Sequence, residues 1–164
     1  MSINFVALAA CDPQGVIGKE GRLPWHYPEE LAHFRASTIG HVMLMGYSTY
    51  VSMPERAFEG RVAIVFTRSR RVRKCENIFQ VSGLEDLMQL YETNPQFLEK
   101  IQWVIGGAEI FDLFFNNGLV QTAIMTYIKK FYEGDTFFPL HHLEHWPKEA
   151  IRETADFYIV RHGL

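Results

Sequence analysis

The chain has 164 residues, of which 48% are hydrophobic and 14% aromatic, and this excludes a disordered chain and predicts one globular domain over residues 1–164. Its formal charge of -3 favours neither a nucleic acid nor an anionic membrane as a partner. Two cysteines, Cys11 and Cys75, are too few for a disulfide framework, so we expect a reducing, cytoplasmic location.

The first predicted element is an apolar run over residues 3–11, INFVALAAC. Its last four residues are similar to a lipoprotein cleavage box, but the run lacks the basic segment and the length of a secretion signal. We therefore interpret it as a buried strand. No apolar run approaches the roughly 20 residues that a membrane-spanning helix needs, so no membrane association is expected.

A loop rich in Gly and Pro leads to a predicted helix over residues 28–38, with Pro28 suited to its first position. Glu30 lies in the first turn, where the helix dipole favours an acid. The spacing leaves two interpretations open. Glu30 is either an exposed acid that interacts with the helix dipole, or a carboxylate at the mouth of an apolar cleft lined by Leu31 and Phe34. In the second case it can bind the amidine-like edge of a heterocycle through two hydrogen bonds.

Short apolar strands and amphipathic helices alternate along the rest of the chain. The expected strands cover residues 41–46, 61–67, 101–105, 121–131 and 154–163. The expected helices cover residues 47–53, 82–92 and 108–118. Ser82 is the expected cap of the second of these helices, and Gly118 ends the third. The order predicts an α/β fold, with a mostly parallel sheet, helices on both faces and an antiparallel edge near the C-terminus.

Glycines follow two of the expected strands where helices begin, at Gly46 and at Gly106-Gly107. Ligands of open α/β sheets bind beyond the carboxyl ends of the strands, and a helix N-terminus there offers N–H groups to phosphate. Glycine also lets a backbone approach a ligand closely. Each of these glycine signals alone is more often a plain turn. The two junctions together, with a basic strand end between them, favour a nucleotide cofactor, although the sequence has neither GxGxxG nor the P-loop pattern.

A basic run, TRSRRVRK, follows the strand expected at residues 61–67. It is open to three interpretations: a solvated loop, a grip on an extra phosphate group of the cofactor, or a nucleic-acid patch. The acidic net charge and the absence of a companion basic helix weaken the third.

Three histidines, His141, His142 and His145, lie close together in the chain. A metal site would need a carboxylate or Cys partner at suitable spacing, and none stands out, so we interpret them as surface histidines and expect no metal.

Five segments carry a resemblance that covers nearly the whole chain: in order, GVIGKEGRLPWHYPEELAHF, VMLMGYSTYVSM, EGRVAIVFTR, WVIGGAEIF and EGDTFFP. They resemble the dihydrofolate reductase family. The resemblance implies an eight-stranded, mixed but mostly parallel sheet flanked by about four helices, with a smaller adenosine-binding lobe. It also implies NADPH-dependent reduction of 7,8-dihydrofolate to 5,6,7,8-tetrahydrofolate by a monomer, in one-carbon metabolism, and a target of antifolates.

By this resemblance, Glu30 is the single active-site acid and hydrogen-bonds the pterin, supported by Trp25 through a water and by Thr126. Arg61 would pair with the α-carboxylate of the substrate's glutamate tail. The residues that would enclose the pterin and aminobenzoyl rings are Leu8, Leu31, Phe34, Met53, Phe58 and Ile105.

The resemblance also implies a cofactor site. Nicotinamide would lie against Ala10 and Ile17, with Gly18 and the loop to Arg22 closing over it. The glycine-rich loop of residues 15–22 is open to two interpretations: a lid that excludes water once the cofactor is bound, or a flexible connection. A cis Gly106–Gly107 peptide is implied as well. The residues that would hold the pyrophosphate and the 2′-phosphate are Gly46, Ser48, Thr49, Gly106, Gly107, Ala108, Glu109, Ile110, Thr67 and Arg68.

The chain departs from the family pattern at Tyr47 and Glu109, where many members carry a basic residue. Both departures remove positive charge near the adenosine phosphates. We therefore expect Arg68, with Arg70 or Arg71, to supply the preference for NADPH. Phe111, where the family often has Tyr, retains ring packing without the hydroxyl.

Two rival functions stay open from the sequence. One is reduction of a ribosylated pyrimidine in riboflavin synthesis, on the same fold, but such reductases lack this acid in this helical setting. The other is a non-catalytic nucleotide or nucleic-acid binding module that uses the basic run.

Overall fold

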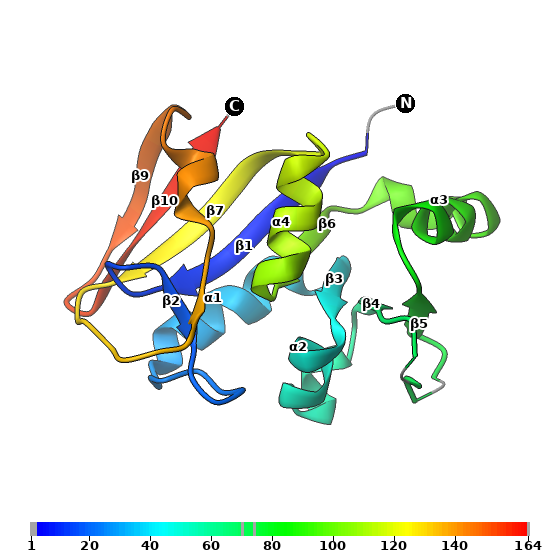
Figure 1. Ribbon diagram of the computed structural model, residues 1–164, viewed down its shortest axis with the longest axis horizontal. Coiled ribbons are helices and arrows are strands. Elements are labelled where there is room, and N and C mark those ends of the chain that lie inside the picture. The colour runs from blue at the N-terminus through cyan, green and yellow to red at the C-terminus, as the bar shows by residue number, and fades with distance from the viewer. Residues whose placement is uncertain (1–2, 70, 74, 164) are drawn as a thin grey trace.

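The computed structural model describes residues 3–69, 71–73 and 75–163, so Arg70 and Lys74 of the basic run lie outside the described residues. Its main sheet has eight strands: β1 Phe5–Cys11, β3 Val42–Gly46, β4 Val62–Phe66, β5 Ile78–Val81, β6 Gln102–Gly106, β7 Val120–Ile128, β9 Lys148–Glu153 and β10 Phe157–Gly163. They lie in the order β5-β4-β3-β6-β1-β7-β10-β9 (Figure 1). Only the pairs β7–β10 and β10–β9 are antiparallel. This confirms the expected mostly parallel sheet with an antiparallel edge.

Helices cover both faces of this sheet. They are α1 Pro28–Thr38, α2 Tyr47–Ser52, α3 Leu84–Thr93 and α4 Ala108–Asn116, with short 3-10 helices η1 Glu55–Phe58, η2 Pro95–Glu99 and η3 Leu140–Leu143. Alternation along β1 assigns the faces, because successive side chains of a strand point to opposite sides. Phe5 packs with Phe114 of α4 on one side, and Leu8 packs with Phe34 of α1 on the other. Figure 1 shows α4 in front of the sheet and α1 behind it.

A second, two-stranded sheet, formed by β2 Val16–Gly18 and β8 Thr136–Phe137, lies beside the main one. The chain after β2 turns back on itself, because Lys19 and Arg22 exchange backbone hydrogen bonds of 2.8 and 3.0 Å. The two residues between them, Glu20 and Gly21, have φ of 51° and 79°, as in a tight hairpin turn with both central residues left-handed.

Several elements and one helix cap differ from those expected from the sequence. β5, β9 and the small sheet were not expected, and the expected strand 121–131 ends at Ile128. The expected Ser82 cap is wrong: Gly83 is the N-cap of α3, and the backbone N–H and hydroxyl of Ser82 instead donate to the Asp86 carboxylate. The helix end at Gly118 is confirmed, because this residue has a φ of 65°. The backbone N–H of Gly118 donates to the Phe115 carbonyl and that of Leu119 to the Phe114 carbonyl, a pair of hydrogen bonds typical of a Schellman motif.

Within residues 3–69, 71–73 and 75–163, no helix is both long enough and apolar enough to cross a membrane.

Candidate functional site

One face of α1 carries three side chains in a row, Glu30, Phe34 and Thr38, which follow one another at a spacing of four residues. Thr38 is fully buried, whereas the Phe34 ring is half-buried and packs against two apolar clusters on this face of the sheet. Among the described residues of α1, Thr38 alone is fully buried, so the helix leaves its own apolar side chains partly open. α1 therefore turns this row towards the sheet, and we call the partly open strip between this helix face and the sheet the candidate groove.

Glu30 lies at the N-terminal end of this row. Burial raises the pKa of its carboxyl from 4.5 to about 7, because removing the charged form from water is costly. Within the described part of the chain, no hydrogen bond to this carboxylate is found. Glu29, one residue earlier, behaves differently, since it is exposed and forms an ion pair with Arg152 at 3.0 Å. The two adjacent acids therefore have separate roles, and Glu30 is the one turned towards the groove.

Arg61 lies at the other end of the row. Its Nε donates to Thr38 Oγ1 at 2.8 Å, Nη1 to the Glu59 carbonyl at 2.5 Å and Nη2 to the Arg35 carbonyl at 2.9 Å. Burial, and then the nearby Arg35, lower the pKa of this guanidinium. These bonds use three of its five N–H donors, and no ion pair with an acid is found among the described residues. A buried guanidinium with donors left over is suited to a carboxylate on a ligand.

Glu30 and the Arg61 anchor point at Thr38 are eight residues apart on one helix, about 12 Å along its axis. The groove thus has an acid at one end, an aromatic wall in the middle and a cation at the other end. Its apolar lining comes from two hydrophobic clusters that share Phe34 and Ile105. One cluster also contains Leu8, and the other also contains Met53 and Phe58. Leu31 is half-buried on α1.

Trp25 and Thr126 lie on the α1 side of the sheet. Trp25 packs with Ala10, and its buried Nε1 has no hydrogen-bond partner among the described residues. Thr126 is the register partner of Ala10 across β1 and β7 and is 1% exposed. No direct hydrogen bond from either residue to Glu30 is present in the described part of the chain. An unpartnered buried indole N–H beside the groove is where a bound water is expected.

A second set of residues converges at the carboxyl ends of β3 and β6. The register places Met45 opposite Gly106, and a side chain added to Gly46 would lie 3.1 Å from Ile110 Cγ1. The Gly106–Gly107 peptide is cis. A Cβ added to Gly107 would meet only Thr49 Oγ1, at 4.0 Å, so it would occupy open space in front of α4.

This space is suited to the phosphates of a nucleotide. Gly107 is the N-cap of α4 and supplies no side-chain cap, so the N–H groups of the first turn, at Ala108 and Glu109, point away from the helix with no intrahelical acceptor. Ser48 is exposed on α2, beside the same strand end. The residues predicted for a pyrophosphate are thus gathered at the carboxyl ends of β3 and β6, and the open space and N–H groups there are suited to the phosphates of a dinucleotide cofactor.

The remaining predicted cofactor residues lie on either side of this edge. Thr67 continues β4 through a backbone bond to Val81 at 2.9 Å, and Arg68 follows it in an exposed position. Ile17 and Gly18 belong to β2, at the base of the lid predicted for residues 15–22. The tip of that lid is held by two contacts, from Glu20 N to Asp135 Oδ2 at 2.9 Å and between Lys19 and Glu133 at 3.3 Å.

A hollow of about 400 Å³ lies at the opposite ends of the strands, where Arg61 shares its wall with His41 and Lys100. It faces away from the glycine-lined edge and is not the predicted cofactor site.

One buried acid that was not predicted from the sequence, Asp12, organises the base of the lid. Its Oδ1 accepts from the backbone N–H groups of Gln14 and Val16, and its Oδ2 from that of Tyr132, each at 2.9 Å. The signal in the sequence was Asp-Pro-x-Gly after a strand, which is typical of a turn that a short acid caps. The long-range bond to Tyr132 has no such signal.

We expect Asp12→Ala to lower the free energy of unfolding by about 3 kcal/mol, because three N–H groups would lose a charged acceptor. Urea unfolding measures the change. Asp12→Asn, which keeps one acceptor oxygen, is expected to lose less, and an equal loss in both variants would contradict the assignment.

Comparison with known proteins gives a consistent result. A sequence profile described as dihydrofolate reductase matches residues 4–157. The chain is 37% identical over 144 residues to dihydrofolate reductase type 8 of Escherichia coli, covering 84% of this chain and 82% of that protein. It is 32% identical over 133 residues to dihydrofolate reductase of Mycoplasma genitalium, covering 81% of each. A solved dihydrofolate reductase from Enterococcus faecalis, complexed with NADP(H) and RAB-propyl, matches with a TM-score of 0.77 and 28% identity over 98% of this chain and 96% of that one.

Proposed function

This chain belongs to the dihydrofolate reductase family, and we propose that it transfers a hydride from NADPH to 7,8-dihydrofolate to give 5,6,7,8-tetrahydrofolate. The observation that carries the proposal is the row on α1, with the Glu30 carboxyl, the Phe34 ring and the Arg61 guanidinium in order along about 12 Å. Dihydrofolate offers matching groups in the same order: an amidine-like pterin edge, aromatic rings and an α-carboxylate.

NADPH supplies the hydride when bound, and the residues of the chain position and polarise the substrate. Glu30 binds the 2-amino group and the neighbouring ring nitrogen of the pterin, and its buried carboxylate favours the polarised ring. The ring nitrogen that must gain a proton lies beyond its reach, so water delivers that proton. Nε1 of Trp25, which has no hydrogen-bond partner among the described residues, supports a bound water on this side of the sheet.

The cofactor phosphates would bind at the edge formed by Gly46, Gly107 and the first turn of α4. The open space at Gly107 and the free N–H groups of that turn support this assignment. Nicotinamide would lie near Ala10, under the lid of residues 15–22. The tip of this lid is held by surface contacts, of Lys19 with Glu133 and of Glu20 with Asp135, which are suited to opening. Closure of this lid would exclude water from the hydride-transfer step.

The test is NADPH oxidation by the purified protein, followed by absorbance, with and without dihydrofolate. We expect oxidation that depends on dihydrofolate. Oxidation with a ribosylated pyrimidine alone would support the rival reductase. Salt-sensitive RNA or DNA binding without turnover would support the binding module. That the protein is a monomer and that it is cytoplasmic both stay predictions. Size-exclusion chromatography tests the first of them.

Replacing Arg68 by Ala is expected to lower the preference for NADPH over NADH by roughly 10- to 100-fold, the value of one charge-assisted contact to the 2′-phosphate. Arg68 is exposed directly after β4, at the edge where the adenosine would lie. The measurement is kcat/KM with each cofactor. Arg73→Ala is the matched control, because Arg73 already forms an ion pair with Glu55. An unchanged ratio in Arg68→Ala would remove Arg68 from cofactor selection.

A further inference from the structure

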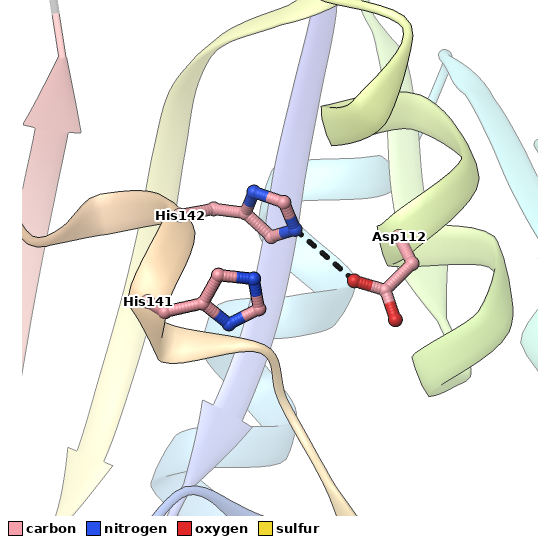
Figure 2. Close-up of side chains that lie close together, drawn as sticks. All are labelled: Asp112, His141 and His142. Carbon is pink, nitrogen blue, oxygen red and sulfur yellow. Dashed lines mark hydrogen bonds and ion pairs between the residues drawn. The ribbon is translucent and has the colours of Figure 1, made fainter.

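Three side chains from two distant segments meet beside α4, away from the groove and the cofactor edge. Asp112 belongs to α4, and His141 and His142 belong to η3. One oxygen or nitrogen atom of each lies within 4.8 Å of the other two. Figure 2 shows both imidazole rings turned towards the carboxylate, with a bond of 3.0 Å between His142 Nε2 and Asp112 Oδ1. The cluster therefore brings two nitrogen donors and one oxygen donor to one place.

Two of the three donors are held in position. The His142 ring stacks on Phe115 of α4 with ring centroids 4.8 Å apart and planes 6° apart, and its side chain is 16% exposed. Asp112 is fixed by its place in the helix and by its bond to His142. The His141 ring lies 4.1 Å from the His142 ring and is exposed, so it can adjust to a ligand at low cost. One movable donor beside two fixed ones gives a site that is preformed but accessible.

Two imidazoles and one carboxylate form a donor set suited to zinc and to other divalent transition metals of similar softness. Ligands bound at about 2.0–2.1 Å in a tetrahedron are roughly 3.3 Å from one another. The present 3.0 Å between His142 Nε2 and Asp112 Oδ1 is close to that separation. The His141 donor lies within 4.8 Å of both, so binding also needs a movement of this exposed ring. We propose that Asp112, His141 and His142 bind a divalent transition-metal ion such as Zn²⁺, with at least one coordination position left to water.

His141 and His145 are exposed, as the sequence led us to expect. The expectation that these histidines lack a carboxylate partner is wrong, because Asp112, on a helix 30 residues earlier in the chain, bonds to His142. His145, the third histidine of the patch, is exposed and is not part of the cluster.

Such an ion would join α4 to the segment that supports the lid. The backbone N–H of Phe138, shortly before η3, donates to the Gly15 carbonyl at 2.8 Å at the start of the lid. A bound metal would therefore fasten this segment to the helix whose first turn faces the cofactor phosphates. Because the ion binds the folded chain, it would also raise the melting temperature as its concentration rises.

The experiment uses tag-free protein, without added cofactor, titrated with Zn²⁺ by calorimetry and with Cu²⁺ by electron paramagnetic resonance. We expect one ion per chain and a superhyperfine pattern from two imidazole nitrogens. Asp112→Asn and His141→Ala should each weaken Zn²⁺ binding at least about tenfold, since even residues behind the ligands contribute that much. His145→Ala is the matched control and should bind as the wild type does.

Circular dichroism without metal shows whether each variant is folded. His141→Ala is expected to fold even if Asp112→Asn does not, because the His141 ring is exposed. Affinity unchanged in both variants would overturn the proposal. So would an equal loss in His145→Ala, or a spectrum with a single imidazole.

Discussion

Replacing Glu30 by Gln is expected to lower the rate of hydride transfer at neutral pH by roughly 10²- to 10³-fold while NADPH binding stays unchanged. Glu30 is the acid at the pterin end of the groove, and glutamine has nearly the same shape but cannot carry a negative charge. Loss of one preorganised electrostatic contact in a site of this kind has an effect of that size. The measurement is single-turnover NADPH oxidation, together with cofactor titration by fluorescence.

Glu29→Gln is the matched control, because Glu29 is the neighbouring acid in the same turn but is exposed and paired with Arg152. It is expected to keep full turnover. Near-normal hydride transfer in Glu30→Gln would remove this acid from the mechanism, and a comparable loss in both variants would indicate damage to α1 instead.

The same substitution is expected to stabilise the fold at high pH, because burial of the Glu30 carboxylate is unfavourable. Its pKa is raised from 4.5 to about 7 in the folded chain, so between these values the folded state binds more protons than the unfolded state. The free energy of unfolding of the wild type therefore falls as the pH rises through this window. At pH 8 we expect Glu30→Gln to be more stable by up to about 3 kcal/mol, and at pH 4 the difference should vanish.

Urea unfolding at both pH values measures this difference, again with Glu29→Gln beside it. A constant difference between Glu30→Gln and the wild type across the window would mean that Glu30 titrates normally. The expected pattern is a residue that costs stability and contributes activity, which is common at active sites.

Replacing Arg61 by Leu is expected to raise KM for dihydrofolate on the order of 10²-fold, because a buried guanidinium paired with a ligand carboxylate is lost. The test compares dihydrofolate with a dihydropterin that lacks the glutamate tail. Only the tailed substrate should be affected, since Glu30 lies at the other end of the groove, about 12 Å away. Steady-state kinetics with both substrates gives the two KM values.

Arg61 also holds the end of α1 through the carbonyl of Arg35 and the hydroxyl of Thr38, so its loss destabilises the fold as well. The tail-free substrate separates the two effects within the same protein, because a distorted α1 would impair both substrates. Arg56→Leu, an exposed arginine of η1, serves as the surface control. Equal changes for both substrates would contradict a contact between Arg61 and the tail.

The elements that the sequence predicted well are those with a strong local pattern. The helix over residues 28–38 has a proline at its start and acids in its first turn, and the structure gives the same bounds. The missed strand β9, KEAIRE, is exposed at all six residues and pairs only with β10, so it has no apolar alternation to reveal it. The small sheet of β2 and β8 was missed because each strand has at most three residues.

The candidate site shows the same division. Glycines after strands and an acid in a first helical turn are local features, so Gly46, Gly107 and Glu30 could be selected as candidates from the sequence. The sequence alone could not decide whether Glu30 is an exposed acid near the helix dipole or a buried acid at the cleft. The answer depends on how closely α1 packs against the sheet. In the structure Glu30 is partly buried, whereas the neighbouring Glu29 is exposed and paired with Arg152, which favours the second interpretation for Glu30.

The sequence by itself determined the order and kind of most elements, the strand ends where ligands bind and the resemblance to one family. These depend on periodicity, caps and motifs, which are set by residues close together in the chain. Only the tertiary structure decided the unpartnered Trp25, the long-range bond of Asp12 to Tyr132 and the meeting of Asp112 with His142. Such contacts join residues separated by up to 120 positions, and their geometry follows from strand order and helix packing, which no local pattern encodes.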